Sequence, residues 1–283
     1  MYNLSDIGVI KKLLFDNGFS FKKSLGQNFL INPSVCPNMA EASGCEGIGV
    51  IEIGTGIGVL SAELCKIAKR VVCIEIDERL KPILATTLGE FDNCEVIWQD
   101  VMKIDLHALI KEKFQGMPVV VCANLPYYIT SPIIMMLLES DLPIDAITVM
   151  VQKEAADRLC AKVGTREAGA ITVAVNYYAE CEIVRKVSRG SFMPQPNVDS
   201  AIIKLTKREK PPIEVKDEKK FFKFIKAGFE WRRKTLQNSA SGLLGIDKSV
   251  IAGALSENGL PETARIEALT MEQLGNMFNS IYN

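Results

Sequence analysis

The sequence predicts an α/β fold: a doubly wound, mostly parallel sheet with an antiparallel hairpin at its edge, followed by a small all-α domain. Short apolar runs alternate with helical patterns between residues 49 and 151, which is typical of a parallel sheet covered by helices on both faces. Two later apolar runs, Ile183–Val187 and Ala201–Leu205, have no helical crossover between them, so we expect them to pair antiparallel. Beyond the charged, proline-containing segment 207–212, only helical patterns follow.

The first domain is expected to begin with an amphipathic helix over Ser5–Phe15, with Ser5 as its N-cap and Asn17-Gly18 as its end. A basic, glycine-containing loop follows at residues 21–30, in which Lys22 and Lys23 are candidate RNA contacts. Helices are expected around Val59–Ala68 and Arg79–Leu88. The five parallel strands are expected at the apolar runs Gly49–Ile53, Val71–Ile76, Val96–Trp98, Val119–Cys122 and Ile147–Val151.

The domain boundary is expected between residues 207 and 208, so that residues 1–207 form the α/β domain and residues 208–283 the helical one. The segment Lys204–Lys234 contains twelve Lys and Arg residues but five Asp and Glu residues, which makes the helical domain a candidate RNA-binding surface. Such a charge run is also typical of a solvated helix face. Helices are expected at Lys219–Phe229, Lys234–Leu244, Lys248–Glu257 and Met271–Tyr282, the last with a capping box formed by Thr270 and Gln273.

Composition excludes several classes of protein. Hydrophobic residues make up 48% and charged residues 24% of the 283 residues, as in an ordinary soluble globular protein. The net charge of −1 means that any surface for nucleic acid has to be local. The eight cysteines include no Cys-x-x-Cys pair and His107 is the one histidine, so we expect no metal site. With no signal-like N-terminus and no apolar run that could span a membrane, we expect a reduced, cytoplasmic monomer.

A glycine loop follows the first expected strand and indicates a nucleotide-like cofactor. It reads Glu52-Ile53-Gly54-Thr55-Gly56-Ile57-Gly58, and glycines let the backbone turn sharply next to a ligand. The dinucleotide fingerprint needs a third glycine at the position of Val59, so the fit to NAD is poor. The pattern is instead similar to the first motif of class I S-adenosylmethionine methyltransferases.

Two acidic residues lie at the ends of the next two expected strands. The carboxylate of Glu75 can accept hydrogen bonds from ribose hydroxyls, and Asp100 suits the exocyclic amine of a cofactor adenine. Each acid alone would be typical of a solvated strand end. Together with the glycine loop they favour S-adenosylmethionine as the methyl donor.

The segment Asn124-Leu125-Pro126-Tyr127 follows the fourth expected strand and resembles the motif of methyltransferases that act on base amines. An adenine amine is a poor nucleophile because its lone pair is delocalised into the ring. The Asn124 side chain and the Leu125 backbone carbonyl can accept its two N–H bonds, which aims the lone pair at the methyl carbon. Tyr127 offers a face for stacking of a flipped base. The alternative is an ordinary Asn-x-Pro turn followed by a core aromatic.

Beyond these motifs, much of the chain resembles the KsgA family, the small-subunit ribosomal RNA adenine dimethyltransferases. Residues from about 20 to 240 match in family order. The matching segments begin with Lys23-Ser24-Leu25-Gly26-Gln27-Asn28-Phe29-Leu30, Glu52-Ile53-Gly54-Thr55-Gly56 and Asn124-Leu125-Pro126-Tyr127-Tyr128-Ile129. They continue with Met150-Val151-Gln152-Lys153-Glu154, Phe192-Met193-Pro194-Gln195-Pro196-Asn197-Val198-Asp199-Ser200 and Arg232-Arg233-Lys234-Thr235-Leu236.

The resemblance implies a role for each residue that would hold the cofactor. Asn28 and Leu30 would close over S-adenosylmethionine, and Gly54 would lie at its amino-acid end. Glu75 would hold the ribose and Asp100 the adenine. Asn124 would border the cofactor as well as the substrate.

On the substrate side, the resemblance implies that Asn124 and Leu125 grip the target amine and that Tyr127 and Phe192 stack on the base. Without the resemblance, Phe192 would be interpreted as a hydrophobic plug for the linker. The implied target is a pair of adjacent adenines in a hairpin loop near the 3′ end of small-subunit ribosomal RNA. Their conversion to dimethyladenosines would belong to ribosome biogenesis.

Three other functions remain open at this point. A related enzyme of the antibiotic-resistance type, acting on large-subunit RNA, is disfavoured by the segments that begin at Phe192 and Arg232. An RNA-binding assembly or transcription factor without the chemistry is disfavoured by intact Glu75, Asn124 and Tyr127. An NAD-dependent dehydrogenase is disfavoured by Val59 and because His107 is expected at the surface.

Overall fold

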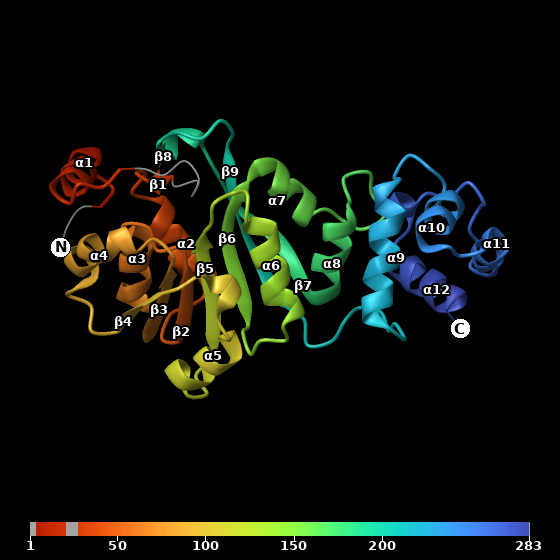
Figure 1. Cartoon of the computed structure of the whole chain (residues 1–283), viewed down its shortest axis with the longest axis horizontal. Helices are drawn as coiled ribbons and strands as arrows, with labels where there is room; N and C mark the ends of the chain where they lie inside the picture. Colours follow the sequence, from red (N-terminus) through yellow and green to blue (C-terminus); the bar gives the residue numbers. More distant parts are fainter. Residues whose placement is uncertain (1–3, 21–27, 283) are drawn as a thin grey trace. The chain divides into compact units, whose positions relative to one another are not determined.

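The computed structural model describes residues 4–20 and 28–282, and Figure 1 traces the chain. Two compact units are present: the first contains the described residues up to Ala156 together with Glu182–Lys207, and the second contains Asp157–Cys181 and the residues from Arg208 onward. The expected boundary between residues 207 and 208 coincides with one junction between the units. Asp157–Cys181, which the sequence analysis placed in the first domain, is grouped with the C-terminal part.

The first unit is built around a seven-stranded sheet with the order β4-β3-β2-β5-β6-β9-β7. Its first five strands are neighbours in parallel pairs. β9 runs antiparallel to β6 from Ala146↔Thr206 to Gln152↔Ser200, and β7 lies at the edge as the hydrogen-bonded neighbour of β9. The strands are β2 (Gly49–Ile53), β3 (Arg70–Glu75), β4 (Cys94–Trp98), β5 (Val119–Asn124), β6 (Ala146–Gln152), β7 (Ala179–Val187) and β9 (Ser200–Lys207).

Helices cover both faces of this sheet, as the alternation of apolar runs predicted. Val50 and Val71 face a hydrophobic cluster that includes α2 and α3. The neighbouring position Gly49 faces the other way, where a Cβ atom would lie 2.3 Å from the ring of Phe114 in α5. The helices of this unit are α1 (Ile7–Asp16), α2 (Val35–Ser43), α3 (Val59–Ile67), α4 (Lys81–Leu88), α5 (Leu106–Phe114) and α6 (Thr130–Glu139); α7 (Lys153–Leu159) crosses the unit boundary.

The N-cap of the first helix lies one residue later than expected. Its N-cap is Asp6, whose carboxylate accepts a hydrogen bond from the Val9 backbone N–H at 3.0 Å, so the expected cap at Ser5 was wrong. A carboxylate three residues before this N–H satisfies it as well as a serine hydroxyl would. The helices α2, α5, α6, α7 and α8 (Ala170–Tyr178) were not predicted from the sequence. The candidate RNA contacts Lys22 and Lys23 lie outside the residues that the structure describes.

A two-residue pairing joins distant parts of the first unit. β1 (Phe29–Leu30) pairs antiparallel with β8 (Phe192–Met193), in the register Phe29↔Met193 and Leu30↔Phe192. The Ile31 N–H extends the pairing by donating to the Ser191 carbonyl at 2.9 Å. The segment proposed to close over the cofactor is therefore hydrogen-bonded to the segment that carries Phe192.

The second unit is helical and has its own core. Its helices are α8 (Ala170–Tyr178), α9 (Glu218–Glu230), α10 (Leu236–Leu244), α11 (Lys248–Glu257) and α12 (Met271–Ile281). Val173 and Tyr177 of α8 belong to the same buried cluster as Phe221 and Phe278, which explains why Asp157–Cys181 joins this unit. The capping box of Thr270 and Gln273 at α12 is present as predicted. Across the described residues, the helices are too short or too polar to cross a bilayer.

Candidate active site

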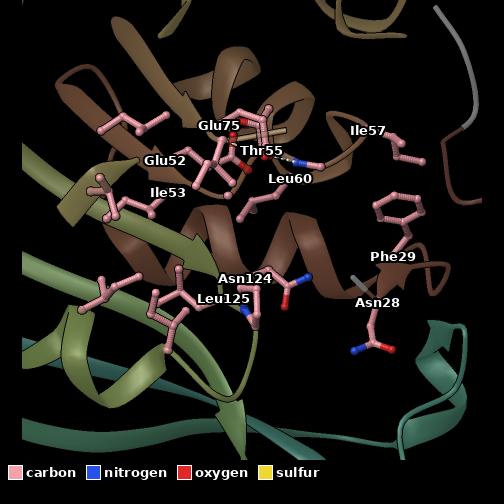
Figure 2. Close-up of a pocket in the computed structure, with 18 of the residues that line it drawn as sticks. Asn28, Phe29, Glu52, Ile53, Thr55, Ile57, Leu60, Glu75, Asn124 and Leu125 are labelled. Carbon is pink, nitrogen blue, oxygen red and sulfur yellow. Dashed lines mark hydrogen bonds between the residues drawn. The ribbon is translucent and has the colours of Figure 1, made fainter. Parts of the chain in front are cut away.

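A single pocket of the first unit gathers the residues singled out from the sequence. It opens where β2, β3, β4 and β5 end, the place at which parallel sheets bind ligands. Figure 2 shows this pocket, with Thr55 and Glu75 above Asn124 and with Phe29 and Asn28 at the right, below Ile57. The lining includes all nine predicted site residues, which are Asn28, Leu30, Gly54, Glu75, Asp100, Asn124, Leu125, Tyr127 and Phe192.

The glycine loop after β2 has a backbone that other residues rarely adopt. Gly54, Gly56 and Gly58 have φ angles of 79°, 58° and 87°, in the left-handed region that favours glycine. A Cβ atom at Gly56 would lie 3.3 Å from the ring of Phe29, and one at Gly54 would lie 3.9 Å from the Asn124 carbonyl oxygen. The loop therefore runs close to both neighbouring segments, and side chains in it would narrow the pocket.

The carboxylate of Glu75 is fixed by three backbone donors. Its Oε2 accepts from the Gly56 N–H at 2.9 Å, and its Oε1 accepts from Ile76 and Asp77 at 2.9 and 2.8 Å. Figure 2 marks the bond to the loop. Burial raises the pKa of Glu75 above its usual value, and the three backbone bonds offset part of this rise. The remaining lone pairs can accept hydrogen bonds from hydroxyl groups of a ligand.

Asp100 is the most open of the acids that line the pocket. It follows β4 and caps a short 3₁₀ helix (Val101–Lys103), where its Oδ1 accepts from the Met102 N–H at 3.0 Å. Lys103 lies 4.0 Å from its Oδ2. One carboxylate oxygen is thus held by the backbone while the residue faces the pocket.

The sequence analysis quoted Glu52 only as the first letter of a motif, yet its carboxyl group is buried under the glycine loop. It is 1% exposed and lines the pocket. Ser61 donates a short hydrogen bond to its Oε2, and the Cys73 thiol donates to the same oxygen at 3.2 Å. Burial raises the pKa of Glu52 to about 8, although both hydrogen bonds lower it. All five residues of β2 are buried, as expected for a strand covered on both faces. The bonds of Glu52 to Ser61 and Cys73 depend on side-chain packing, which the sequence does not specify.

The segment after β5 carries the proposed substrate residues. Asn124 ends the strand, and its side chain reaches into the pocket between the glycine loop and the Asn28 segment (Figure 2). The Pro126 carbonyl accepts from the Ile129 N–H and the Thr130 hydroxyl, both at 3.1 Å, which holds the turn. The hydroxyl of Tyr127 lies 2.7 Å from the Ser200 hydroxyl.

Phe192 reaches the same pocket from a distant part of the chain. It is 3% exposed and belongs to the hydrophobic cluster of the sheet, and its backbone pairs with Leu30. Phe192 lines the pocket together with Tyr127. Its burial also agrees with the alternative interpretation, a hydrophobic plug.

Two further observations concern residues outside the predicted set. The Thr55 hydroxyl in the glycine loop is buried and has no hydrogen-bond partner within the described part of the chain, although it lines the pocket. His107 is exposed at the start of α5, where its Nε2 lies 2.8 Å from the Ser140 carbonyl oxygen. It is not among the pocket residues.

Comparison with known proteins gives one consistent family. The model of the family "Ribosomal RNA adenine dimethylase" matches residues 18–283. The chain is 51% identical over 279 residues to the ribosomal RNA small subunit methyltransferase A of Geobacillus thermodenitrificans, covering 97% of this chain and 95% of the relative. It is 47% identical over 282 residues to the protein of the same name from Clostridioides difficile, covering 99% and 98%.

Solved structures give the same fold. The 23S rRNA methyltransferase ErmE has a TM-score of 0.69 and 28% identity, covering 90% of this chain and 100% of that one. A dimethyladenosine transferase from Plasmodium falciparum has a TM-score of 0.70 and 26% identity, covering 88% and 95%. With the strand order described above, these likenesses confirm the predicted class I methyltransferase fold.

Proposed function

Because the chain belongs to the family of ribosomal RNA adenine dimethylases, as its motifs predicted, we propose that it transfers methyl groups from S-adenosylmethionine to two adjacent adenines of small-subunit ribosomal RNA. The products would be dimethyladenosines in a hairpin loop near the 3′ end of that RNA. One observation carries the proposal: the motif for a base amine and the glycine loop for the cofactor line the same pocket.

The cofactor side of the pocket fits S-adenosylmethionine. Glu75 offers carboxylate lone pairs suited to the two ribose hydroxyls, and Asp100 keeps an oxygen for the cofactor's adenine amine. The left-handed backbone at Gly54 leaves room for the amino-acid end. Asn28 and Leu30 would close the site, since Leu30 pairs with Phe192 and Asn28 directly precedes this pairing. The bound cofactor supplies an electrophilic methyl group on a sulfonium.

Asn124 and Leu125 would orient the target amine. In the first transfer the two carbonyl oxygens would accept one N–H bond each, and in the second the singly methylated amine would keep one N–H for them. The nitrogen lone pair is thereby directed at the methyl carbon. The methyl group would pass to this nitrogen as the methyl–sulfur bond breaks, with the electron pair left on sulfur. The proton of the resulting cationic nitrogen leaves to water.

Tyr127 and Phe192 would hold the flipped base between them. Both line the pocket, and base–aromatic stacking is worth about 1–3 kcal/mol per base. Stacking also compensates for unpairing of the adenine, which costs a few kcal/mol. The two rings would therefore select an extruded base before Asn124 contacts its amine.

The helical second unit, which contains Asp157–Cys181 and the residues from Arg208 onward, would bind RNA through the basic residues of its C-terminal part. Lys223 and Lys226 lie exposed on the polar side of α9, and Arg233 and Lys234 lie exposed after its end. Arg232 is engaged by Glu267 instead. We expect the protein to act as a monomer on a small-subunit particle, in the cytoplasm where such particles are assembled.

The decisive experiment is a comparison of substrates. Purified protein would be incubated with labelled S-adenosylmethionine and, separately, undermethylated small subunits, mature large subunits or free RNA, and the label then mapped. We expect label on two adjacent adenines of the small-subunit RNA. Label on the large subunit instead would favour the activity named for ErmE, with which the chain shares only 28% identity.

A further inference from the structure

Ser200 is buried at a position where its hydroxyl can control the tyrosine of the active site. It is 0% exposed and begins β9. Its hydroxyl and that of Tyr127 lie 2.7 Å apart, a hydrogen bond between residues that are 73 positions apart in the sequence. We infer that Ser200 is a positioning residue for methyl transfer, which fixes the Tyr127 ring as a stacking face for the target base.

The backbone of Ser200 is itself well anchored. It pairs with Gln152 in the β6–β9 ladder. The preceding residue, Asp199, accepts the Lys153 N–H at its carbonyl oxygen and the Arg189 N–H at its carboxylate, both at 2.9 Å. A hydroxyl on such a support has little freedom, so a partner bonded to it is held in one place.

The tyrosine needs such support because its own segment is a turn. Tyr127 follows Pro126 and is only partly buried. Burial raises the pKa of its phenol, and the bond to Ser200 lowers it in part. Without that bond, the Tyr127 side chain could change rotamer, and the ring would leave its orientation. Stacking on a base requires one orientation of the ring.

The same hydrogen bond links the two faces of the proposed base site. Phe192 and Ser200 lie on one segment, which is pinned by the contact between Arg189 and Asp199. Tyr127 belongs to the turn that follows β5. The hydrogen bond between Tyr127 and Ser200 therefore fixes the Tyr127 ring relative to the segment that carries Phe192.

This inference rests on the proposed function, and its test compares variants. Ser200→Ala and Tyr127→Phe each remove one side of the hydrogen bond and keep both aromatic rings. Thr148→Val is the matched control, because Thr148 is buried in β6, next to β9, and its hydroxyl has no hydrogen-bond partner within the described residues. Cofactor affinity should be unchanged in all three.

Single-turnover methylation should fall about tenfold in Ser200→Ala and in Tyr127→Phe, since slight misplacement of reacting groups costs rate. The double variant should fall no further, because both changes remove one interaction. Thr148→Val should keep the wild-type rate. With 2-aminopurine at the target adenine, the emission of bound RNA should change alike in the first two variants, because stacking quenches this fluorophore.

A wild-type rate in Ser200→Ala would overturn the inference, as would a rate loss from Ser200→Ala that persists in the Tyr127→Phe background. If Ser200→Ala fails to fold, Tyr127→Phe alone decides: unchanged rate and emission would overturn it. A wild-type protein that methylates no small-subunit RNA would instead refute the proposed function, so the two failures are distinguishable.

Discussion

The two sides of the pocket are held by different kinds of interaction. On the cofactor side, Glu75 is fixed by three backbone N–H groups from the glycine loop and the adjoining turn. On the base side, Tyr127 is held through one side-chain hydrogen bond to Ser200, and Phe192 through the two-residue pairing with β1. Glu75 is therefore held by backbone groups at the ends of the neighbouring strands β2 and β3, whereas Tyr127 and Phe192 depend on contacts between segments that are distant in the sequence. The β1–β8 pairing also holds Leu30 of the cofactor side.

This difference predicts how the two sides respond to substitution. A change on the cofactor side should alter affinity for the cofactor and leave the geometry of the base site intact. A change on the base side should alter the rate of transfer and leave cofactor affinity intact. Substitutions that moved both quantities together would show that the pocket acts as one rigid site.

The largest effect is expected on the base side, from Asn124→Ala. Loss of one acceptor for the amine should cut the single-turnover rate by on the order of a hundredfold or more, as for one lost oxyanion contact. Cofactor affinity, measured by calorimetry, should remain nearly unchanged. Asn124→Asp should retain more activity than the alanine variant, because its carboxylate still accepts an N–H bond. A rate loss below tenfold in Asn124→Ala would contradict the amine-gripping role.

On the cofactor side, Glu75→Ala should weaken S-adenosylmethionine binding by about 1–3 kcal/mol, since hydrogen bonds to the ribose are lost. The control is Glu78→Ala, at an exposed carboxylate three residues along the chain, which should bind the cofactor as the wild type does. Calorimetry that gives equal affinity for Glu75→Ala and wild type would remove Glu75 from the site. NAD should give no measurable binding in any of these proteins.

The difference between residues at strand ends and residues held by distant segments also explains which parts of the site could be predicted from the sequence. The glycine loop, Glu75 and Asn124 lie next to strand ends, so strand alternation alone brought them to one edge of the sheet. The position of Phe192 came from the family resemblance, because a two-residue pairing such as β1–β8 leaves no periodic pattern. The bond between Tyr127 and Ser200 depends on register between β6 and β9, which a single sequence does not specify.

The grouping of residues 157–181 escaped prediction for a related reason. The sequence boundary at residue 207 was placed on composition, because charge and two prolines mark a linker. The contacts of Val173 and Tyr177 with Phe221 and Phe278 lie in side-chain packing between helices far apart in the chain. Composition cannot report such packing.

A moderate effect is expected at Glu52, which lies beneath the cofactor side. Its pKa rises from 4.5 to about 8 on burial, so the folded protein binds more protons than the unfolded chain between these values. Stability should therefore fall as pH rises through this window, by at most about 1.4 kcal/mol per pH unit. Glu52→Gln should remove this dependence.

Urea unfolding of wild type and Glu52→Gln at several pH values between 5 and 8 measures the difference. The control is Glu46→Gln, at an exposed position, which should keep the pH dependence of the wild type. Identical pH dependence in wild type and Glu52→Gln would show that the Glu52 carboxyl group ionises in the folded protein at an ordinary pH.

A smaller effect is expected away from the pocket, in the helical unit. Lys223→Ala and Lys226→Ala should each weaken association with small-subunit particles and reduce the slope of log affinity against log salt by about 1, the value for one lost phosphate contact. Lys111→Ala, an exposed lysine on α5, is the control and should change neither quantity. Unchanged slopes in both α9 variants would place the RNA surface elsewhere.

The smallest effect is expected at His107, which belongs to neither side of the pocket. Its ring contacts the Ser140 carbonyl, and it is the chain's one histidine, so its removal tests for a histidine base. Methyl transfer to an adenine amine gives a nitrogen far more acidic than an ordinary ammonium, and its proton can leave to water after the barrier is crossed. General-base help is typically worth about 100- to 10,000-fold in rate, and the rate then follows the ionisation of the base.

We therefore expect single-turnover rates to be nearly flat between about pH 6.5 and 8.5, the window of a histidine base, in wild type and His107→Ala alike. If ionisation of Glu52 changes the rate in this pH range, that change would be absent in Glu52→Gln and can be separated from an effect of His107. A one-proton titration in this window that disappears in His107→Ala would contradict a mechanism in which Asn124 and Leu125 act by orientation alone.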